Sequence, residues 1–174
     1  MLKFLTLILV SVGALRAEPQ TNVVVAPHAS DFVALSGDAV VPFKATEFLR
    51  ARYTVLYFGA GWCPDCRRFS PSLVGAYDHQ TSAVPRRFEV LLISQDKSAE
   101  GMVSFMKSEK MKWPALAFDK IASATDLTRF YSGKGIPCLT VINQQGKILL
   151  QSKSDQDAND LLKQFQDLMA SEEH

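Results

Sequence analysis

The chain has 174 residues, about the length of one domain, and 47% of them are hydrophobic, which is enough for a substantial buried core. Its 19 basic and 18 acidic side chains nearly cancel, so charge gives no argument for a nucleic-acid or strongly acidic partner. The three histidines lie far apart in the sequence, at positions 28, 79 and 174, so they do not form a metal-binding motif.

Residues 1–17 have the form of a secretory signal peptide. Lys3 supplies the positive start, residues 4–12 are almost wholly apolar, and small residues precede a cleavage site after Ala17. The apolar run is shorter than the roughly 18 residues of a membrane-spanning helix, although an uncleaved anchor and a buried first helix are alternative interpretations. We therefore expect an exported protein, in the periplasm or secreted, that does not insert into a membrane once this segment is removed.

Residues 18–31 form a short, polar-leaning lead with a candidate edge strand at residues 23–25, and residues 32–174 form the domain. Within this domain, the spacing of apolar and turn-forming residues predicts both strands and helices. The strands are expected over residues 32–35, 39–41, 53–58, 88–93, 115–118, 138–142 and 147–150. The helices are expected over residues 46–50, 64–80, 98–110 and 125–131, and a last helix opens at Ser154 and Asp157 and buries Ala158, Leu161, Leu162, Phe165, Leu168 and Met169.

Two cysteines separated by two residues lie where the strand at residues 53–58 gives way to a helix. This places Cys63 at the tip of the turn and Pro64 at the first helical position, where a missing N–H costs nothing. The unpaired N–H groups of the helix point toward the Cys63 sulfur and favour its thiolate, which is the reactive form of cysteine. Cys66 lies one helical turn further on, close enough to close a disulfide after Cys63 has attacked a partner.

A Cys-x-x-Cys pair also occurs in zinc sites and in purely structural disulfides. A zinc site needs about four ligands, and the chain has neither a second such pair nor a His-x-x-x-His motif. Thiols tend to pair in an oxidising compartment, and three cysteines leave one over. Cys63 and Cys66 are the natural pair, Cys138 is the remainder, and redox chemistry is the favoured interpretation.

Residues 62–66, which read Trp-Cys-Pro-Asp-Cys after an apolar strand, resemble the thioredoxin superfamily. Pro71, which is expected to kink the helix after the cysteines, and the Ile136-Pro137 step before a hairpin extend the likeness. More narrowly, the chain resembles the tryparedoxin and nucleoredoxin branch, over nearly all of residues 32–169. The supporting stretches are residues 57–68, 88–96, 113–119 and 135–137.

The resemblance implies an α/β fold, a thioredoxin-like three-layer α/β/α sandwich around a central mixed sheet, with an N-terminal βαβ half and a C-terminal ββα half. It implies that Cys63 is the nucleophile, that Cys66 is the resolving thiol, and that the two form the redox disulfide. It also implies a cis peptide bond between Ile136 and Pro137 that faces the cysteines. The residues assigned to substrate docking are Trp62, Pro64, Ile136 and Pro137.

Three residues depart from the family pattern or have two interpretations. Tyr57 takes the position where thioredoxin has a buried Asp, so the proton acceptor of Cys66 is unassigned. Cys138 takes a position where the family often has Thr, and it is either a buried small hydrophobe or a third redox thiol. Trp62 either shields the nucleophile at the docking surface or packs in the core.

The charged residues around the cysteines are candidate modulators of the nucleophile. Asp65 lies between the two cysteines, where its charge opposes formation of the Cys63 thiolate. Arg67 and Arg68 lie within about one turn and offset that charge, unless they are simply solvated.

These observations predict an exported thiol–disulfide oxidoreductase that reduces protein or peptide disulfides and is re-reduced by an upstream thiol donor. The cysteine pair is itself the redox centre, so we expect no metal, flavin or nucleotide cofactor, and we expect a monomer without a nucleic-acid partner. The same pair also suits an oxidase or isomerase of exported proteins, and a non-catalytic binding module of the same fold is a further alternative.

Overall fold

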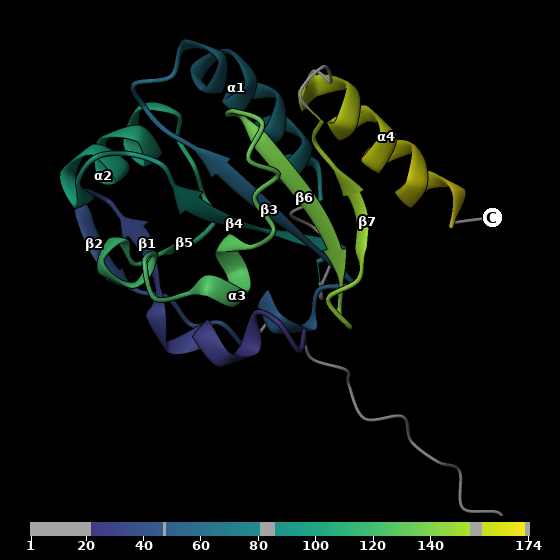
Figure 1. Cartoon of the computed structure of the whole chain (residues 1–174), viewed down its shortest axis with the longest axis horizontal. Coiled ribbons are helices and arrows are strands. Elements are labelled where there is room, and N and C mark those ends of the chain that lie inside the picture. Colours follow the sequence, from purple (N-terminus) through teal and green to yellow (C-terminus); the bar gives the residue numbers. More distant parts are fainter. Residues whose placement is uncertain (1–21, 47, 81–85, 154–157, 173–174) are drawn as a thin grey trace, which may run out of the picture.

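The computed structural model describes residues 22–46, 48–80, 86–153 and 158–172 (Figure 1). The predicted signal peptide, residues 1–17, and the predicted capping pair of Ser154 and Asp157 lie outside these residues. Within them, no helix combines the length and the apolar character that a membrane crossing requires.

The described part of the chain alternates strands and helices largely as predicted. The strands are β1 (Phe32–Ser36), β2 (Ala39–Pro42), β3 (Tyr53–Gly59), β4 (Phe88–Ser94), β5 (Ala115–Leu116), β6 (Cys138–Asn143) and β7 (Ile148–Gln151). The α-helices are α1 (Pro64–His79), α2 (Ala99–Ser108), α3 (Thr125–Thr128) and α4 (Ala158–Ser171). Three 3₁₀ turns are η1 (Ala26–Asp31), η2 (Phe48–Arg50) and η3 (Phe118–Lys120).

The strands join one mixed sheet in the order β2-β1-β5-β4-β3-β6-β7. The central strand β3 runs parallel to β4 and antiparallel to β6, so that Val55 lies opposite Val90 on one side and Val141 on the other. Every residue of β3 and β4 is buried, which is typical of strands covered on both faces. The units β3–α1–β4 and β6–β7–α4 are the predicted βαβ and ββα halves.

Side chains alternate between the two faces of the sheet, and each face has its own core. One face packs against α1, α2 and α4 through residues such as Leu73, Met106 and Phe165. The opposite face packs against η2 and α3 through residues such as Phe48 and Leu127. The helices α1 and α4 lie next to each other over the sheet (Figure 1). The predicted three-layer α/β/α arrangement is therefore confirmed.

The predicted edge strand at residues 23–25 is wrong, because these residues form a turn that leads into η1. The Asn22 side-chain oxygen accepts hydrogen bonds from the backbone N–H groups of Val24 and Val25, both at 3.1 Å, and this Asx-type turn curls the chain. The Asn22 amide also donates to Thr54 Oγ1 of β3 at 3.1 Å. The lead before β1 is therefore anchored on the central sheet.

Three short elements also differ from their predicted bounds. The helix expected over residues 46–50 is the 3₁₀ turn η2, and α3 ends at Thr128 instead of residue 131. The strand β5 has two residues instead of four, because the chain turns into η3, where the Ile121 N–H bonds back to the Phe118 carbonyl.

Candidate active site

Cys63 lies at the N-terminal end of α1, directly after the turn that follows β3. Its backbone is extended, with φ −87° and ψ 117°, and Pro64 occupies the first helical position as predicted. The backbone N–H of Cys66 donates to Cys63 Sγ at 3.4 Å. This is the contact through which the N-terminus of a helix stabilises a thiolate.

The two cysteines differ in their access to solvent. Cys63 is 6% exposed and Cys66 is fully buried, so only Cys63 can be reached by a partner. Burial raises the pKa of the Cys66 thiol to about 12, and the neighbouring Cys63 sulfur adds to this effect. The Ala60 backbone and the Tyr57 hydroxyl act on this pKa in the opposite direction. Both cysteines are free thiols, so the structure describes the reduced pair and their disulfide stays a prediction.

Tyr57 and Cys66 are buried in the same core, under α1. The Tyr57 hydroxyl lies 3.1 Å from Ser70 Oγ and acts to lower the pKa of the Cys66 thiol. All three residues are fully buried, and none of the largest influences on the pKa of Cys66 comes from a carboxylate. The sequence analysis did not identify Ser70 as a residue near the site. Its position four residues after Cys66, on the same face of the helix, could have indicated it.

Two residues after β4 brace the turn that leads to Cys63. The Asp96 carboxylate accepts hydrogen bonds from the Gly61 N–H at 3.0 Å and from the Ser94 hydroxyl at 2.9 Å. The Trp62 indole N–H donates to the Gln95 carbonyl at 3.1 Å, and 56% of Trp62 is exposed. Core packing is therefore the wrong interpretation of Trp62. Sequence reasoning missed Gln95 and Asp96, although the carboxyl ends of neighbouring parallel strands meet at one edge of a sheet.

Of the two arginines expected to offset the charge of Asp65, only Arg68 pairs with it. Arg68 donates to the Asp65 carboxylate, and both side chains are exposed. Arg67 donates instead to the Gly61 carbonyl at 2.9 Å, where it holds the turn before Cys63. Any offset of the Asp65 charge therefore comes from Arg68, and Arg67 acts on the backbone.

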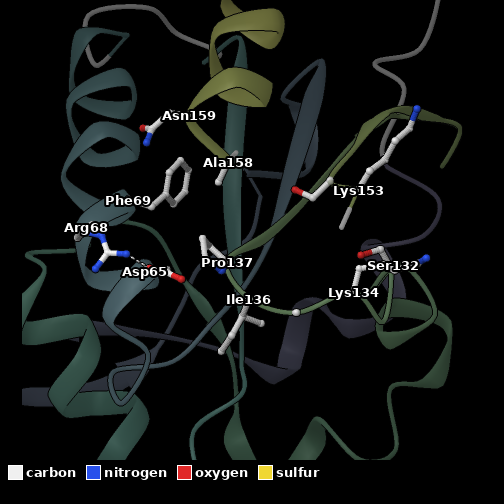
Figure 2. A pocket seen from close by; sticks show the side chains of 12 residues that line it. Asp65, Arg68, Phe69, Ser132, Lys134, Ile136, Pro137, Lys153, Ala158 and Asn159 are labelled. Atoms are coloured by element: carbon white, nitrogen blue, oxygen red, sulfur yellow. Dashed lines mark hydrogen bonds and ion pairs between the residues drawn. The ribbon is translucent and has the colours of Figure 1, made fainter. Parts of the chain in front are cut away.

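The Ile136–Pro137 peptide bond is cis, as predicted. The Ile136 carbonyl accepts a hydrogen bond from the Cys63 thiol at 3.4 Å, so this loop faces Cys63. Ile136 and Pro137 also line a cavity of about 440 Å³ formed by α1, the loop before β6 and the start of α4. Figure 2 shows Pro137 near its centre, with Asp65 on one side and Lys134 on the other. This is the concave surface next to the cysteines on which a substrate can lie.

Cys138 lies on the opposite face of the sheet from the cysteine pair. It is fully buried in the core that contains Phe58 and Leu127, whereas Cys63 and Cys66 belong to the core under α1. This position favours the interpretation of Cys138 as a small buried hydrophobe. Among the residues described, no three His, Cys, Asp or Glu side chains are close enough together to bind a metal ion.

A cysteine at a helix N-terminus, a buried partner one turn on and a cis-proline opposite define a thiol–disulfide redox protein of the thioredoxin type. The chain belongs to the thioredoxin-like family, whose model matches residues 51–148. Within that family it is tryparedoxin- and nucleoredoxin-like, as the sequence predicted. This membership supports thiol–disulfide oxidoreduction in a general sense.

The relatives come from distant organisms. Tryparedoxin of Trypanosoma brucei brucei is 33% identical over 117 residues, which are 67% of this chain and 75% of that protein. Nucleoredoxin of Xenopus laevis is 32% identical over 106 residues, 61% of this chain, and the match spans only 25% of that longer protein. A solved structure of tryparedoxin II complexed with glutathionylspermidine has a TM-score of 0.55 and 32% identity, and the match covers 70% of this chain and 81% of that one.

Proposed function

We propose that this protein is an exported thiol–disulfide oxidoreductase that reduces protein or peptide disulfides with Cys63 as nucleophile and Cys66 as resolving thiol. The observation that carries the proposal is the position of Cys63 between the Cys66 N–H and the carbonyl of Ile136, a residue that lines a surface cavity. Trp62, which is exposed beside it, adds an apolar contact for a protein substrate.

Reduction proceeds in two exchanges that move two electrons and two protons to the substrate. The Cys63 thiolate attacks one sulfur of the substrate disulfide, a mixed disulfide forms, and the other substrate sulfur leaves as a thiolate that takes up a proton. Cys66 then attacks the Cys63 sulfur, which releases the second substrate thiol and leaves a Cys63–Cys66 disulfide. The backbone beside Pro137 suits an extended substrate chain, which would add to it as a strand does.

Insulin disulfide reduction with dithiothreitol as the reductant tests this assignment. We expect Cys63→Ser to abolish turnover and Cys66→Ser to accumulate mixed disulfides on Cys63, since the second exchange is lost. Cys138→Ala is the matched control, because this thiol lies on the other face of the sheet, and it should turn over normally. Wild-type turnover by Cys63→Ser would refute the assignment.

The direction of the reaction is tested by equilibrating the cysteine pair with glutathione buffers. A dedicated reductase has a more reducing potential than glutathione, whereas an oxidase or isomerase has a potential near it or above it. If the cysteines of the native protein resist both reduction by a mild reductant and subsequent thiol labelling, the protein is a binding module with a thioredoxin fold.

The upstream donor is a thiol, because regeneration needs two electrons delivered to a disulfide. The relative complexed with glutathionylspermidine makes a glutathione-type thiol a reasonable first donor to test. We expect such a thiol to support insulin reduction in place of dithiothreitol, and failure at millimolar concentration would direct the search to a protein donor.

Export is tested separately from chemistry. If residues 1–17 are a signal peptide, the mature protein begins at Glu18, and mass spectrometry of the protein from its native cell detects that N-terminus. Recovery of the uncleaved chain from a reducing compartment would refute export, and it would not affect the redox assignment.

A further inference from the structure

The cavity beside the cis-proline loop has an apolar inner wall. Phe69 of α1 and Ala158 of α4 line it and are almost fully buried, and Figure 2 shows both side chains on the side of the cavity above Pro137. Its volume of about 440 Å³ lies within the range of about 300–1,000 Å³ that is typical of sites for small ligands. The inner wall therefore suits an apolar side chain of a bound peptide.

The charged residues that line this cavity leave an excess of positive charge. Asp65 is the only carboxylate among the described lining residues, and it is paired with Arg68. Lys134 and Lys153 also line the cavity, and within the described part of the chain neither ammonium group has an ion-pair partner. The rim of the cavity is therefore basic.

Lys134 has a defined place in the loop that faces Cys63. Both of its chain neighbours are glycines in left-handed backbone, with φ of 72° and 109°. The N–H of the second one, Gly135, donates to the Tyr131 hydroxyl at 3.3 Å, which fixes the loop. Lys134 comes two residues before Ile136, whose carbonyl accepts from the Cys63 thiol, so at most about 7 Å of backbone separates the two residues of this loop.

Lys153 follows an anchored residue at the end of β7. The Leu139 N–H donates to Ser152 Oγ and the Ser152 N–H donates to the Leu139 carbonyl, both at 2.9 Å. Asp155 and Asp157 follow Lys153 in the sequence and lie outside the described residues. Lys134 is therefore the main source of the positive charge in the inference, and Lys153 is secondary.

A second cavity, of about 520 Å³, lies on the other side of the cysteine turn and is lined by Trp62. Its charged lining residues are Arg67 and Lys97 together with Asp96 and Glu109, so the two signs balance. Charge can therefore select a substrate on the cis-proline side of Cys63, and it has no net effect on the Trp62 side.

We propose that the cavity beside Pro137 is a subsite that selects substrates with an acidic residue near the reactive cysteine, and that Lys134 is its main specificity-determining residue. An extended chain rises about 3.3 Å per residue, so an acidic side chain about two to four positions from that cysteine reaches Lys134. A basic side chain at the same position is repelled. The proposal rests on the proposed function, since it concerns the disulfide that Cys63 attacks.

Three peptides that differ in one residue test this preference. Each has a single cysteine joined by a disulfide to an aromatic thiol whose free thiolate absorbs visible light, and Glu, Gln or Lys about three positions away. Stopped-flow mixing with the reduced protein measures thiolate release, and each rate is divided by that of the same peptide with dithiothreitol, which has no cavity. At low ionic strength we expect the Glu peptide to react at least about fivefold faster than the Lys peptide, with Gln between them.

Variants of single lysines locate the source of the preference. Lys134→Glu should reverse the order of the peptides, and Lys153→Glu should reduce the ratio of the Glu rate to the Lys rate. Lys44→Glu is the matched control, because this exposed lysine lines a cavity next to η2, which packs on the opposite face of the sheet, and it should keep the wild-type ratio. The wild-type ratio should also fall toward one at about 0.5 M salt, since exposed charges are screened.

Equal rates for the three peptides with the wild type, or the wild-type ratio in Lys134→Glu, would overturn the proposal. So would a ratio that salt does not change. If Lys134→Glu does not fold, Lys134→Gln decides, because removal of one charge should lower the ratio and an unchanged ratio would overturn the proposal. Absence of thiolate release with every peptide would instead refute the proposed function, so the two failures are distinguishable.

Discussion

The side chain of Asn22 connects the N-terminal segment to the centre of the sheet, and we predict that Asn22→Ala destabilises the protein substantially. Its oxygen accepts from the N–H groups of Val24 and Val25, and its amide donates to Thr54 Oγ1 and to the Asn143 carbonyl, at 3.1 to 3.4 Å. Val25 and Thr54 are fully buried, so their polar groups cannot turn to water after the substitution.

Each buried group left without a partner costs about 1–3 kcal/mol, so we expect the free energy of unfolding to fall by roughly 2–4 kcal/mol. With a slope of about 2 kcal/mol/M in urea, the unfolding midpoint should fall by about 1–2 M. Asn22→Asp keeps the acceptor for the two backbone amides and loses the donor to Thr54, so it should lose an intermediate amount.

Urea titration followed by tryptophan fluorescence measures these midpoints. Val23→Ala is the control, because this side chain is 61% exposed and should change the free energy of unfolding by no more than about 0.5 kcal/mol. If Asn22→Ala and Val23→Ala had the same midpoint, the anchoring role of Asn22 would be refuted.

Three further predictions concern the site and its surroundings. Gly59→Ala should destabilise the protein by about 1–3 kcal/mol, because the added methyl group clashes with the Tyr57 ring. This loss of stability should be smaller when Tyr57 is also replaced by Leu, and thermal unfolding of the double-mutant cycle measures the coupling. Trp62→Ala should lower kcat/KM for insulin at least about fivefold while leaving the rate with a small aromatic disulfide unchanged, and equal losses with both substrates would exclude a docking role. The hydrogen bond from His28 lowers the pKa of Asp126, so this carboxylate stabilises the fold above its unfolded pKa of about 3.8, and that stabilisation is lost as the pH falls through the lower folded value. The urea midpoints of wild type and Asp126→Asn should therefore differ at pH 5 and converge near pH 2. A constant difference between the two midpoints would contradict the pairing.

The predictable part of this fold is the part in which local sequence and burial agree. The strands that flank α1 are continuous apolar runs, and the helix repeats its buried residues at Phe69, Leu73 and Tyr77, so strand, helix and strand could be placed within a residue or two. The turn at Asn22 could not, because three consecutive valines have a high strand propensity and a single side-chain acceptor overrides it.

The order of residues in the chain by itself determined the βαβ unit and the place in it of Cys63 and Cys66, the proposed nucleophile and resolving thiol, since a strand, a Cys-x-x-Cys pair and a helix-starting proline are all local features. Only the tertiary structure decided what surrounds the sulfurs, because these contacts join segments far apart in the sequence. Packing of β3 against α1 brings Tyr57 and Ser70 together at Cys66, the parallel pairing of β3 and β4 brings Asp96 to the turn, and the alternation of β6 directs Cys138 away from the pair. No spacing along the chain specifies such contacts, because they depend on which faces of distant elements are buried together.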